Sequence, residues 1–126
     1  VGRICTVFPF WFCENYKKYM DNEASLPFDQ HDLLSALAPR RVYVASAADD
    51  AWADPVSEYL SCVAAGEAYV SAGLTGFVHP DRLPTVGDSF HEGEIGYHLR
   101  AGKHYLSRED WAQYMKYLDK YFGATK

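Results

Sequence analysis

Apolar residues in the middle of the chain change from a strand-like to a helical spacing. Residues 41–47, RVYVASA, form a short and mostly apolar run that predicts a parallel strand covered on both faces. After it, Asp54 can cap a helix, and Pro55 can take the first helical position, where a missing N–H does no harm. Apolar residues then recur at helical spacing up to about Gly73, at Val56, Tyr59, Leu60, Val63 and Ala64. A strand, an acidic loop and a helix in this order are half of a βαβ unit.

A second strand and a final helix are predicted in the C-terminal third. Residues 73–93 contain four glycines and two prolines without a periodic pattern, so we expect a long loop there. Residues 94–100 predict a second short strand, which ends in the run Ala101 to His104. Ser107 and Asp110 have the spacing of a capping box at the start of a helix that Gly123 closes. The apolar residues of that helix share one face: Trp111, Tyr114, Met115, Leu118 and Phe122.

The N-terminal third has a less regular pattern. Residues 6–16, TVFPFWFCENY, are densely apolar and aromatic and are interrupted by Pro9, which predicts buried strand or loop rather than helix. Asp29 can cap a short helix that runs through Leu37 and ends at Pro39. The chain shows no internal repeat and no low-complexity tract.

Composition and length narrow the classes of protein. The 126 residues suffice for one small domain or for part of one, and they are few for a whole doubly wound α/β enzyme. A net charge of -5 without a basic stripe makes nucleic acid an unexpected partner. No apolar run approaches the roughly 20 residues of a membrane helix. The chain begins at Val1 rather than Met, and we expect any export signal on a segment outside it.

The cysteines and most of the histidines indicate structural roles. Cys5, Cys13 and Cys62 are an odd number at irregular spacing without CxxC, so neither a zinc site nor a complete disulfide framework is expected, and we interpret them as buried thiols. Four histidines lack a metal-binding spacing such as HExxH, and we expect structural roles for them: His31, His79, His91 and His98. For the same reasons we expect no metal site. Glu14 in the aromatic run is expected to be a hydrogen-bonded structural carboxylate.

Titratable residues follow both predicted strands. Asp49 and Asp50 come directly after the first strand, and His104 comes after the second. In open α/β sheets, ligands and catalytic groups lie beyond the carboxyl ends of the strands. In α/β-hydrolases the triad follows the chain order Ser, acid, His, so Asp50 and His104 fit its second and third places. A carboxylate on Nδ1 fixes the imidazole tautomer and stabilises the imidazolium that forms when Nε2 accepts the proton of the nucleophile.

Each of these residues also has an ordinary structural interpretation. Asp49 and Asp50 are common turn and cap residues, His104 could be a hydrogen-bonded loop residue, and Trp52 could belong to a core or an interface. No GxSxG elbow occurs, because none of the candidate serines has the flanking glycines that place a nucleophile on a strained turn. We therefore expect the nucleophile to lie outside this chain.

Three runs of sequence resemble one known family. FPFWFCENYKKY, LPFDQHDLLSALAPRRVYVASAADDAWADP and IGYHLRAGKHYLSREDW are together similar to the C-terminal portion of the glucuronoyl esterases, carbohydrate esterase family 15. The likeness covers essentially the whole chain. It implies the C-terminal part of an α/β-hydrolase, a three-layer αβα sandwich that is incomplete on its own, with residues 1–126 belonging to a single catalytic domain.

The resemblance also implies an activity and its residues. Family members cleave the ester between the (4-O-methyl-)glucuronic acid branches of xylan and lignin alcohols, and they need no cofactor. The match implies His104 as the catalytic base and acid, Asp50 as a triad acid and Trp52 as a contact to the glucuronate. The nucleophilic Ser belongs to an N-terminal segment, which we expect as the partner of this chain. Some members use a Glu from that segment as the acid. A secreted or periplasmic location is implied.

Two other functions stay open from the sequence. One is a non-catalytic carbohydrate-binding or interaction module that keeps the hydrolase scaffold. The other is a related acetyl or feruloyl esterase.

Overall fold

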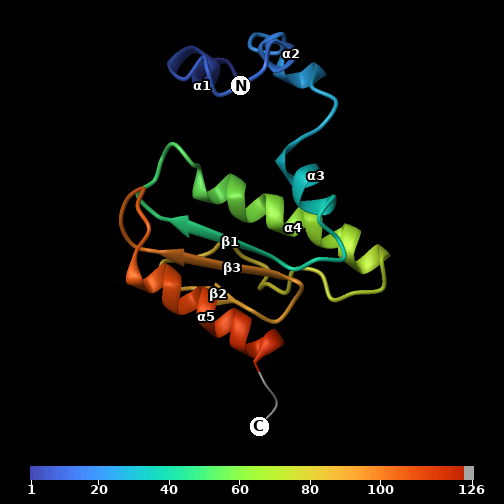
Figure 1. Ribbon diagram of the computed structural model, residues 1–126, viewed down its shortest axis with the longest axis vertical. Helices are drawn as coiled ribbons and strands as arrows, with labels where there is room; N and C mark the ends of the chain where they lie inside the picture. Colours follow the sequence, from blue (N-terminus) through green and yellow to red (C-terminus); the bar gives the residue numbers. More distant parts are fainter. Residues whose placement is uncertain (124–126) are drawn as a thin grey trace.

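A computed structural model of the protein describes residues 1–123. A small mixed sheet lies between two long helices, and a separate N-terminal group of short helices lies beyond it (Figure 1). In chain order the elements are α1 (Gly2–Val7), α2 (Glu14–Lys17), the 3-10 helix Glu23–Ser25, α3 (Gln30–Ser35), β1 (Val42–Ala47), α4 (Pro55–Ser71), β2 (Ser89–Phe90), β3 (Ile95–Arg100) and α5 (Arg108–Phe122).

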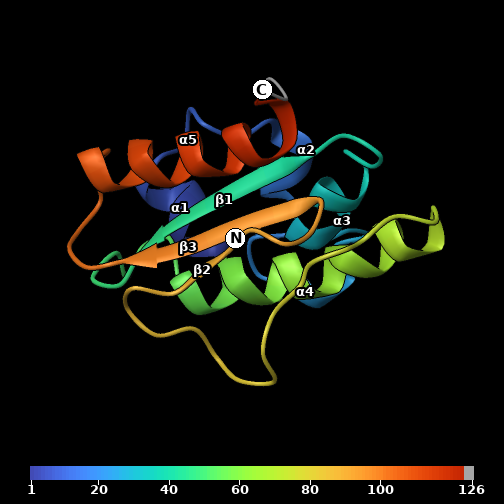
Figure 2. The same cartoon turned by 90° about the horizontal axis from the view of Figure 1, so that it is seen from below.

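The sheet has the strand order β1-β3-β2. Strands β1 and β3 are parallel, in register from Val42 opposite Ile95 to Ala47 opposite Arg100, and β2 pairs antiparallel with β3. Helix α4 connects the two parallel strands and covers one face of the sheet, while α5 covers the other (Figure 2). The three layers confirm the αβα arrangement that the family resemblance implies.

Alternation along β3 assigns its side chains to the two helical layers. Ile95, Tyr97 and Leu99 pack with the inner face of α4, which contributes the buried residues Tyr59, Cys62, Ala65 and Tyr69. The intervening residues, Gly96, His98 and Arg100, face α5. All six residues of β3 are buried, because β3 is the central strand. By contrast, β1 lies at the edge of the described sheet and is half-buried over Val42–Ala45, less covered than the sequence predicts.

The predicted helix starts are confirmed in detail. Asp54 caps α4 by accepting a hydrogen bond from Ser57 N, with Pro55 at the first helical position. Ser107 and Asp110 form a reciprocal capping box at the start of α5. Asp29 caps α3, which ends at Ser35 and is therefore shorter than expected. The predicted loop 73–93 is irregular except for the two residues of β2.

Three glycines allow close backbone contacts between α4, the long loop and the segment just before β3. A Cβ on Gly66 of α4 would lie 2.9 Å from Phe77 N, and one on Gly76 would lie 2.4 Å from Gly66 O. A Cβ on Gly93 would lie 1.8 Å from Gly76 O, far inside van der Waals contact. This glycine stack brings the long loop against the helix just before β3 begins.

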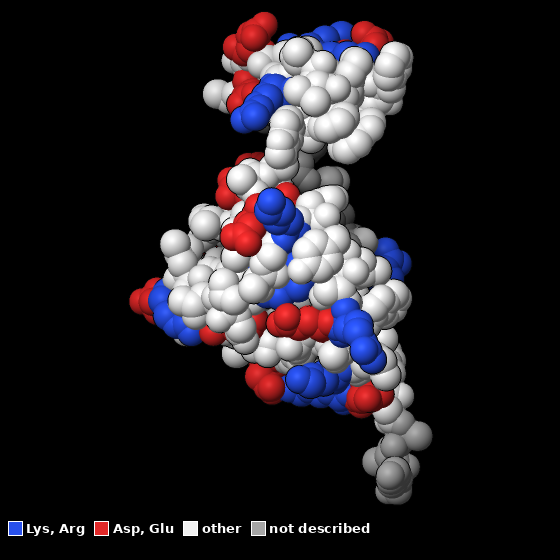
Figure 3. All heavy atoms as spheres, turned by 90° about the vertical axis from the view of Figure 1, so that its left-hand side faces the viewer, with Lys and Arg blue, Asp and Glu red and all other residues white. Residues whose placement is uncertain are grey.

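The prediction that residues 6–16 are buried is wrong, whereas the predicted loop is present at residues 8–13, between two short helices. The segment contains the end of α1, a turn at Pro9 and α2, and Phe10 is 98% exposed. No strand of the described sheet lies beside this segment to complete a backbone ladder, so the rings pair locally instead, Phe8 on Trp11 with centroids 4.2 Å apart. The N-terminal lobe consists of α1, α2 and the 3-10 helix Glu23–Ser25, and a narrow neck joins it to the rest of the described molecule (Figure 3). Cys5 and Cys62 are buried as expected, but Cys13 is exposed.

The apolar face of α5 is only partly covered. Tyr117 is buried against the sheet, whereas four apolar residues of the same helix are exposed: Trp111, Met115, Leu118 and Phe122. Three of them, Trp111, Leu118 and Phe122, line a groove that α5 forms with Pro39, Arg40 and the start of β1. In the described residues this groove therefore remains an uncovered apolar surface beside the free edge of β1.

Candidate active site

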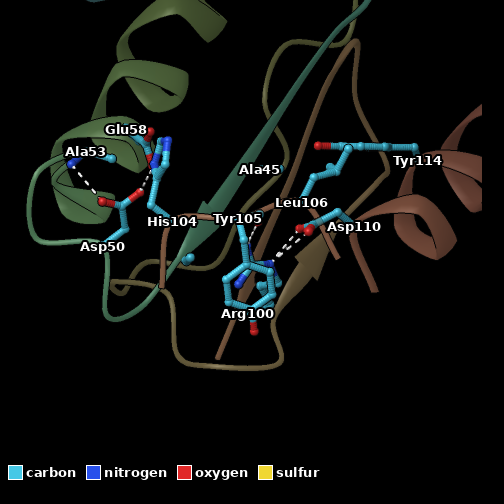
Figure 4. Close-up of a pocket in the computed structure, with 11 residues that line it drawn as sticks. Ala45, Asp50, Ala53, Glu58, Arg100, His104, Tyr105, Leu106, Asp110 and Tyr114 are labelled. Carbon is cyan, nitrogen blue, oxygen red and sulfur yellow. Dashed lines mark hydrogen bonds and ion pairs between the residues drawn. The ribbon is translucent and has the colours of Figure 1, made fainter. Parts of the chain in front are cut away.

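The two parallel strands end at the same edge of the sheet and bring Asp50 and His104 together. Asp50 follows β1 by three residues and His104 follows β3 by four. His104 Nδ1 lies 2.7 Å from Asp50 Oδ2, although 54 residues separate the two in sequence (Figure 4). The two loops are also joined through their backbones, because Asp49 N donates to Gly102 O at 2.9 Å. The acid and the imidazole are thus fixed to one another by a side-chain contact and a main-chain contact.

Asp50 is the buried member of this pair. Only 10% of its side chain is accessible, and its other oxygen accepts a long hydrogen bond from Ala53 N at 3.4 Å. The hydrogen bond from His104, together with backbone hydrogen bonds from the turn, keeps the pKa of the Asp50 carboxyl below its usual value. Asp50 is therefore an ionised acceptor in the neutral pH range.

His104 presents its outer nitrogen away from Asp50. Its side chain is 89% exposed in the described residues. With the proton on Nδ1 and directed at the carboxylate, Nε2 is left as an acceptor, and within residues 1–123 it makes no hydrogen bond. This is the tautomer that a general base needs to accept a proton from a hydroxyl nucleophile.

A cavity of about 290 Å³ lies beside the pair. Its walls are the ends of β1 and β3, the first turns of α4 and α5, and the loop that carries His104; the lining residues include Asp50, Glu58, Arg100, His104, Tyr105 and Asp110 (Figure 4). This is a concave space of mixed polarity at the carboxyl ends of the strands, where α/β enzymes bind their ligands.

Glu58 is another carboxylate of this cavity, and the sequence analysis did not single it out. It accepts a hydrogen bond from Ser46 Oγ at 2.6 Å. Burial raises its pKa, and the negative charges of Asp50 and Asp54 act in the same direction. The only signal in the sequence is an acidic residue in the first turn of α4, which is common at helix starts.

Trp52 lies on the same loop as Asp50 but does not line the cavity. Its side chain is about half exposed, with Arg3 Cζ 4.5 Å from the ring centroid and Phe8 packed edge-on at 5.8 Å. In this structure Trp52 therefore connects the N-terminal lobe to the loop after β1.

Two of the other histidines belong to a buried structural network. Tyr43 Oη lies 2.7 Å from His91 Nε2 and 3.0 Å from His98 Nδ1, and His98 Nε2 lies 2.9 Å from Asp110 Oδ1. Burial lowers the pKa of His91. Among residues 1–123, no cluster of His, Cys, Asp or Glu side chains has the arrangement of a metal site. No helix in the same range is both long and apolar enough to cross a membrane.

Comparison with known proteins identifies the family. The profile of the family described as "Glucuronyl esterase, fungi" matches residues 4–73. The curated Carbohydrate esterase MZ0003, from an unknown prokaryotic organism, is 42% identical over 119 residues, which are 94% of this chain and 27% of that protein.

Solved structures agree with this similarity. A promiscuous CE15 esterase from the marine bacterial metagenome superposes with a TM-score of 0.89 at 41% identity, over 94% of this chain and 30% of its own. A glucuronoyl esterase from Solibacter usitatus superposes with a TM-score of 0.86 at 40% identity, and the match covers 97% of this chain and 31% of that one. The chain thus spans less than a third of the relatives that it matches. A profile match over more than half of its length, supported by these similarities, shows that the chain belongs to the glucuronoyl esterases of carbohydrate esterase family 15.

Proposed function

We propose that residues 1–126 are the C-terminal part of a single α/β-hydrolase catalytic domain that hydrolyses the ester between (4-O-methyl-)glucuronic acid of xylan and lignin alcohols. The observation that carries the proposal is the 2.7 Å contact between His104 Nδ1 and Asp50 Oδ2, at adjacent parallel strand ends, in a member of this family. Such an enzyme acts outside the cytoplasm, where its polymeric substrate lies.

In the proposed mechanism this chain handles the protons. His104 Nε2 removes the proton of a serine hydroxyl as the oxygen attacks the uronate ester carbonyl, and Asp50 stabilises the resulting imidazolium. The imidazolium then protonates the leaving alcohol. In the second half, His104 takes a proton from a water molecule that attacks the acyl carbon, and it returns this proton to the serine oxygen as the uronic acid leaves. No resident metal or organic cofactor enters this sequence of steps.

The serine comes from an N-terminal portion of the same enzyme in this proposal. Two features of the structure support such a neighbour. Within residues 1–123, the apolar groove between α5 and β1 is uncovered, and β1 is an edge strand whose outer backbone groups a further strand could pair with. The exposed position of Nε2 also leaves room for a hydroxyl group to approach His104.

We assign Trp52 to contact with the glucuronate. It follows Asp50 by two residues on the loop at the strand ends, and about half of its ring surface is free. An aromatic face at this position can pack against the apolar face of a sugar ring.

His104→Ala tests the proposal in the full-length enzyme, in which the N-terminal portion precedes this chain. Loss of the base should reduce turnover of a glucuronate benzyl ester by at least about 10³-fold without a change in thermal stability, because His104 is exposed. His31→Ala is the matched control, since the His31 side chain is 41% accessible and its Nε2 lies 3.5 Å from Asp32 Oδ1. Both residues belong to α3 and not to the proposed site. Turnover by His104→Ala within threefold of the parent would refute the assignment. Higher turnover of acetyl or feruloyl esters by the parent would assign it to a related esterase.

A further inference from the structure

Arg100, the last residue of β3, grips the loop that carries His104. Its Nη1 donates to Ala101 O at 2.9 Å and to Lys103 O at 3.2 Å, and its Nη2 donates to Lys103 O and to Tyr105 O. The ring of Tyr105 lies over the guanidinium, with Cζ 4.3 Å from the ring centroid (Figure 4). One side chain therefore binds the carbonyl groups of both residues that neighbour His104, Lys103 and Tyr105.

The guanidinium itself is anchored from the opposite side. Its Nε donates to both carboxylate oxygens of Asp110, at 2.8 and 2.9 Å, and both side chains are 96% buried. Asp110 also accepts from Ser107 N at 2.6 Å, which places it in the capping box of α5. Through Arg100 and Asp110, the loop that carries His104 is thus fixed to the end of β3 and to the start of α5.

His104 has few other contacts to fix its orientation. Its side chain is 89% exposed, and Asp50 is its one hydrogen-bond partner in residues 1–123. Between Arg100 and Ser107 the loop contributes no helix or strand, so its backbone needs other partners. Four of the five carbonyls from Ala101 to Tyr105 have such a partner. The Arg100 guanidinium donates to three of them, and Asp49 N donates to Gly102 O.

We propose that Arg100 is a positioning residue for the catalytic base, because its guanidinium holds the backbone on both sides of His104 and so sets where the imidazole meets Asp50 and the nucleophile. Arginine suits this role because its planar fork has five donors, which bind the carboxylate and three carbonyls at once. A lysine at the same place keeps the charge but has three donors on a single nitrogen, and it cannot span the same set.

The inference rests on the proposed function and is tested with Arg100→Lys in the full-length enzyme. We expect kcat for a glucuronate benzyl ester to fall by about 10- to 100-fold with KM within twofold, because a small displacement of a catalytic group is costly while the substrate contacts remain. Arg82→Lys is the matched control. Arg82 also binds a carboxylate through two nitrogens, Asp88 at 2.6 and 3.1 Å, and also donates to a loop carbonyl, but it lies away from the cavity.

A double-mutant cycle separates positioning from a loss of stability. If Arg100 acts through the Asp50–His104 contact, Arg100→Lys should cost much less in an Asp50→Asn background than in the parent, whereas a stability defect gives additive effects. If Arg100→Lys does not fold, Asp110→Asn carries the same cycle, since it keeps an acceptor for Nε and removes the anchoring charge. Additive effects, or a folded Arg100→Lys enzyme with kcat within threefold of the parent, would overturn the inference. Activity that survives His104→Ala refutes the proposed function itself, so the two failures are distinct.

Discussion

Asp50→Asn separates the charge of the proposed triad acid from its shape. Asp50 Oδ2 lies 2.7 Å from His104 Nδ1, and a hydrogen bond to an ionised acceptor is roughly twice as strong as one to a neutral amide. If the asparagine presents its oxygen to Nδ1, the tautomer survives and only the stabilisation of the imidazolium is reduced, which corresponds to about a tenfold loss of kcat. If it presents its NH2 group, Nε2 carries the proton and cannot serve as a base, and the loss approaches 10⁴-fold.

The assay is steady-state hydrolysis of a glucuronate benzyl ester by the full-length enzyme near neutral pH, where the lowered pKa of Asp50 keeps the parent carboxylate ionised. Asp49→Asn provides the matched control, because it removes the same charge one residue earlier from an exposed side chain that makes no hydrogen bond within residues 1–123. We expect Asp49→Asn to stay within twofold of the parent. A loss below threefold in Asp50→Asn would refute Asp50 as the acid, and it would assign that role to another carboxylate, such as Glu58 or a Glu of the N-terminal portion.

Two further predictions concern stability. Hydrogen bonds from Ser107, His98 and Arg100 outweigh the effect of burial and lower the pKa of Asp110 from 3.8 to about 2, so its contribution is complete above pH 4 and is lost as the pH falls through 2. The free energy of unfolding, measured with urea, should therefore fall by about 2 kcal/mol less between pH 4 and pH 2 in Asp110→Asn than in the parent. An equal fall in both proteins would contradict this. Gly93→Ala should cost about 3 kcal/mol, because its Cβ would meet Gly76 O at 1.8 Å. Gly87→Ala, with a positive φ but open space around it, should cost only about 1 kcal/mol, and the reverse order would show that the glycine stack relaxes freely.

Much of the α/β core could be predicted from the sequence, because local signals and burial agree there. The Asp54-Pro55 and Ser107–Asp110 signatures mark the helix starts correctly, and the apolar runs mark β1 and β3 to within one residue. The positions of Asp50 and His104 could also be predicted, since residues that follow parallel strands meet at one edge of the sheet.

The remaining features depend on contacts that no local pattern encodes. The aromatic run of residues 6–16 resembles interior sequence, yet Phe10 is almost fully exposed, because apolar composition does not indicate which surface will cover it. Glu58 and Arg100 carry no motif, and their places in the cavity follow from the pairing of β1 with β3 and the packing of α4 and α5. Trp52 lies near Asp50 in sequence but faces the N-terminal lobe, which sequence spacing alone could not predict.

The main-chain hydrogen bond between Asp49 and Gly102 joins the two loops independently of the side chains of Asp50 and His104, the proposed acid and base. The proposed acid and base are consequently joined through the paired strands β1 and β3 and through their loops, while the proposed nucleophile belongs to a different region of the fold. Substitutions elsewhere in the enzyme can then alter the approach of the serine or the shape of the substrate site without separating the charge pair. Under the proposed mechanism, selection for a new ester could therefore proceed in one region of the protein while the proton-transfer groups of the other stay in place.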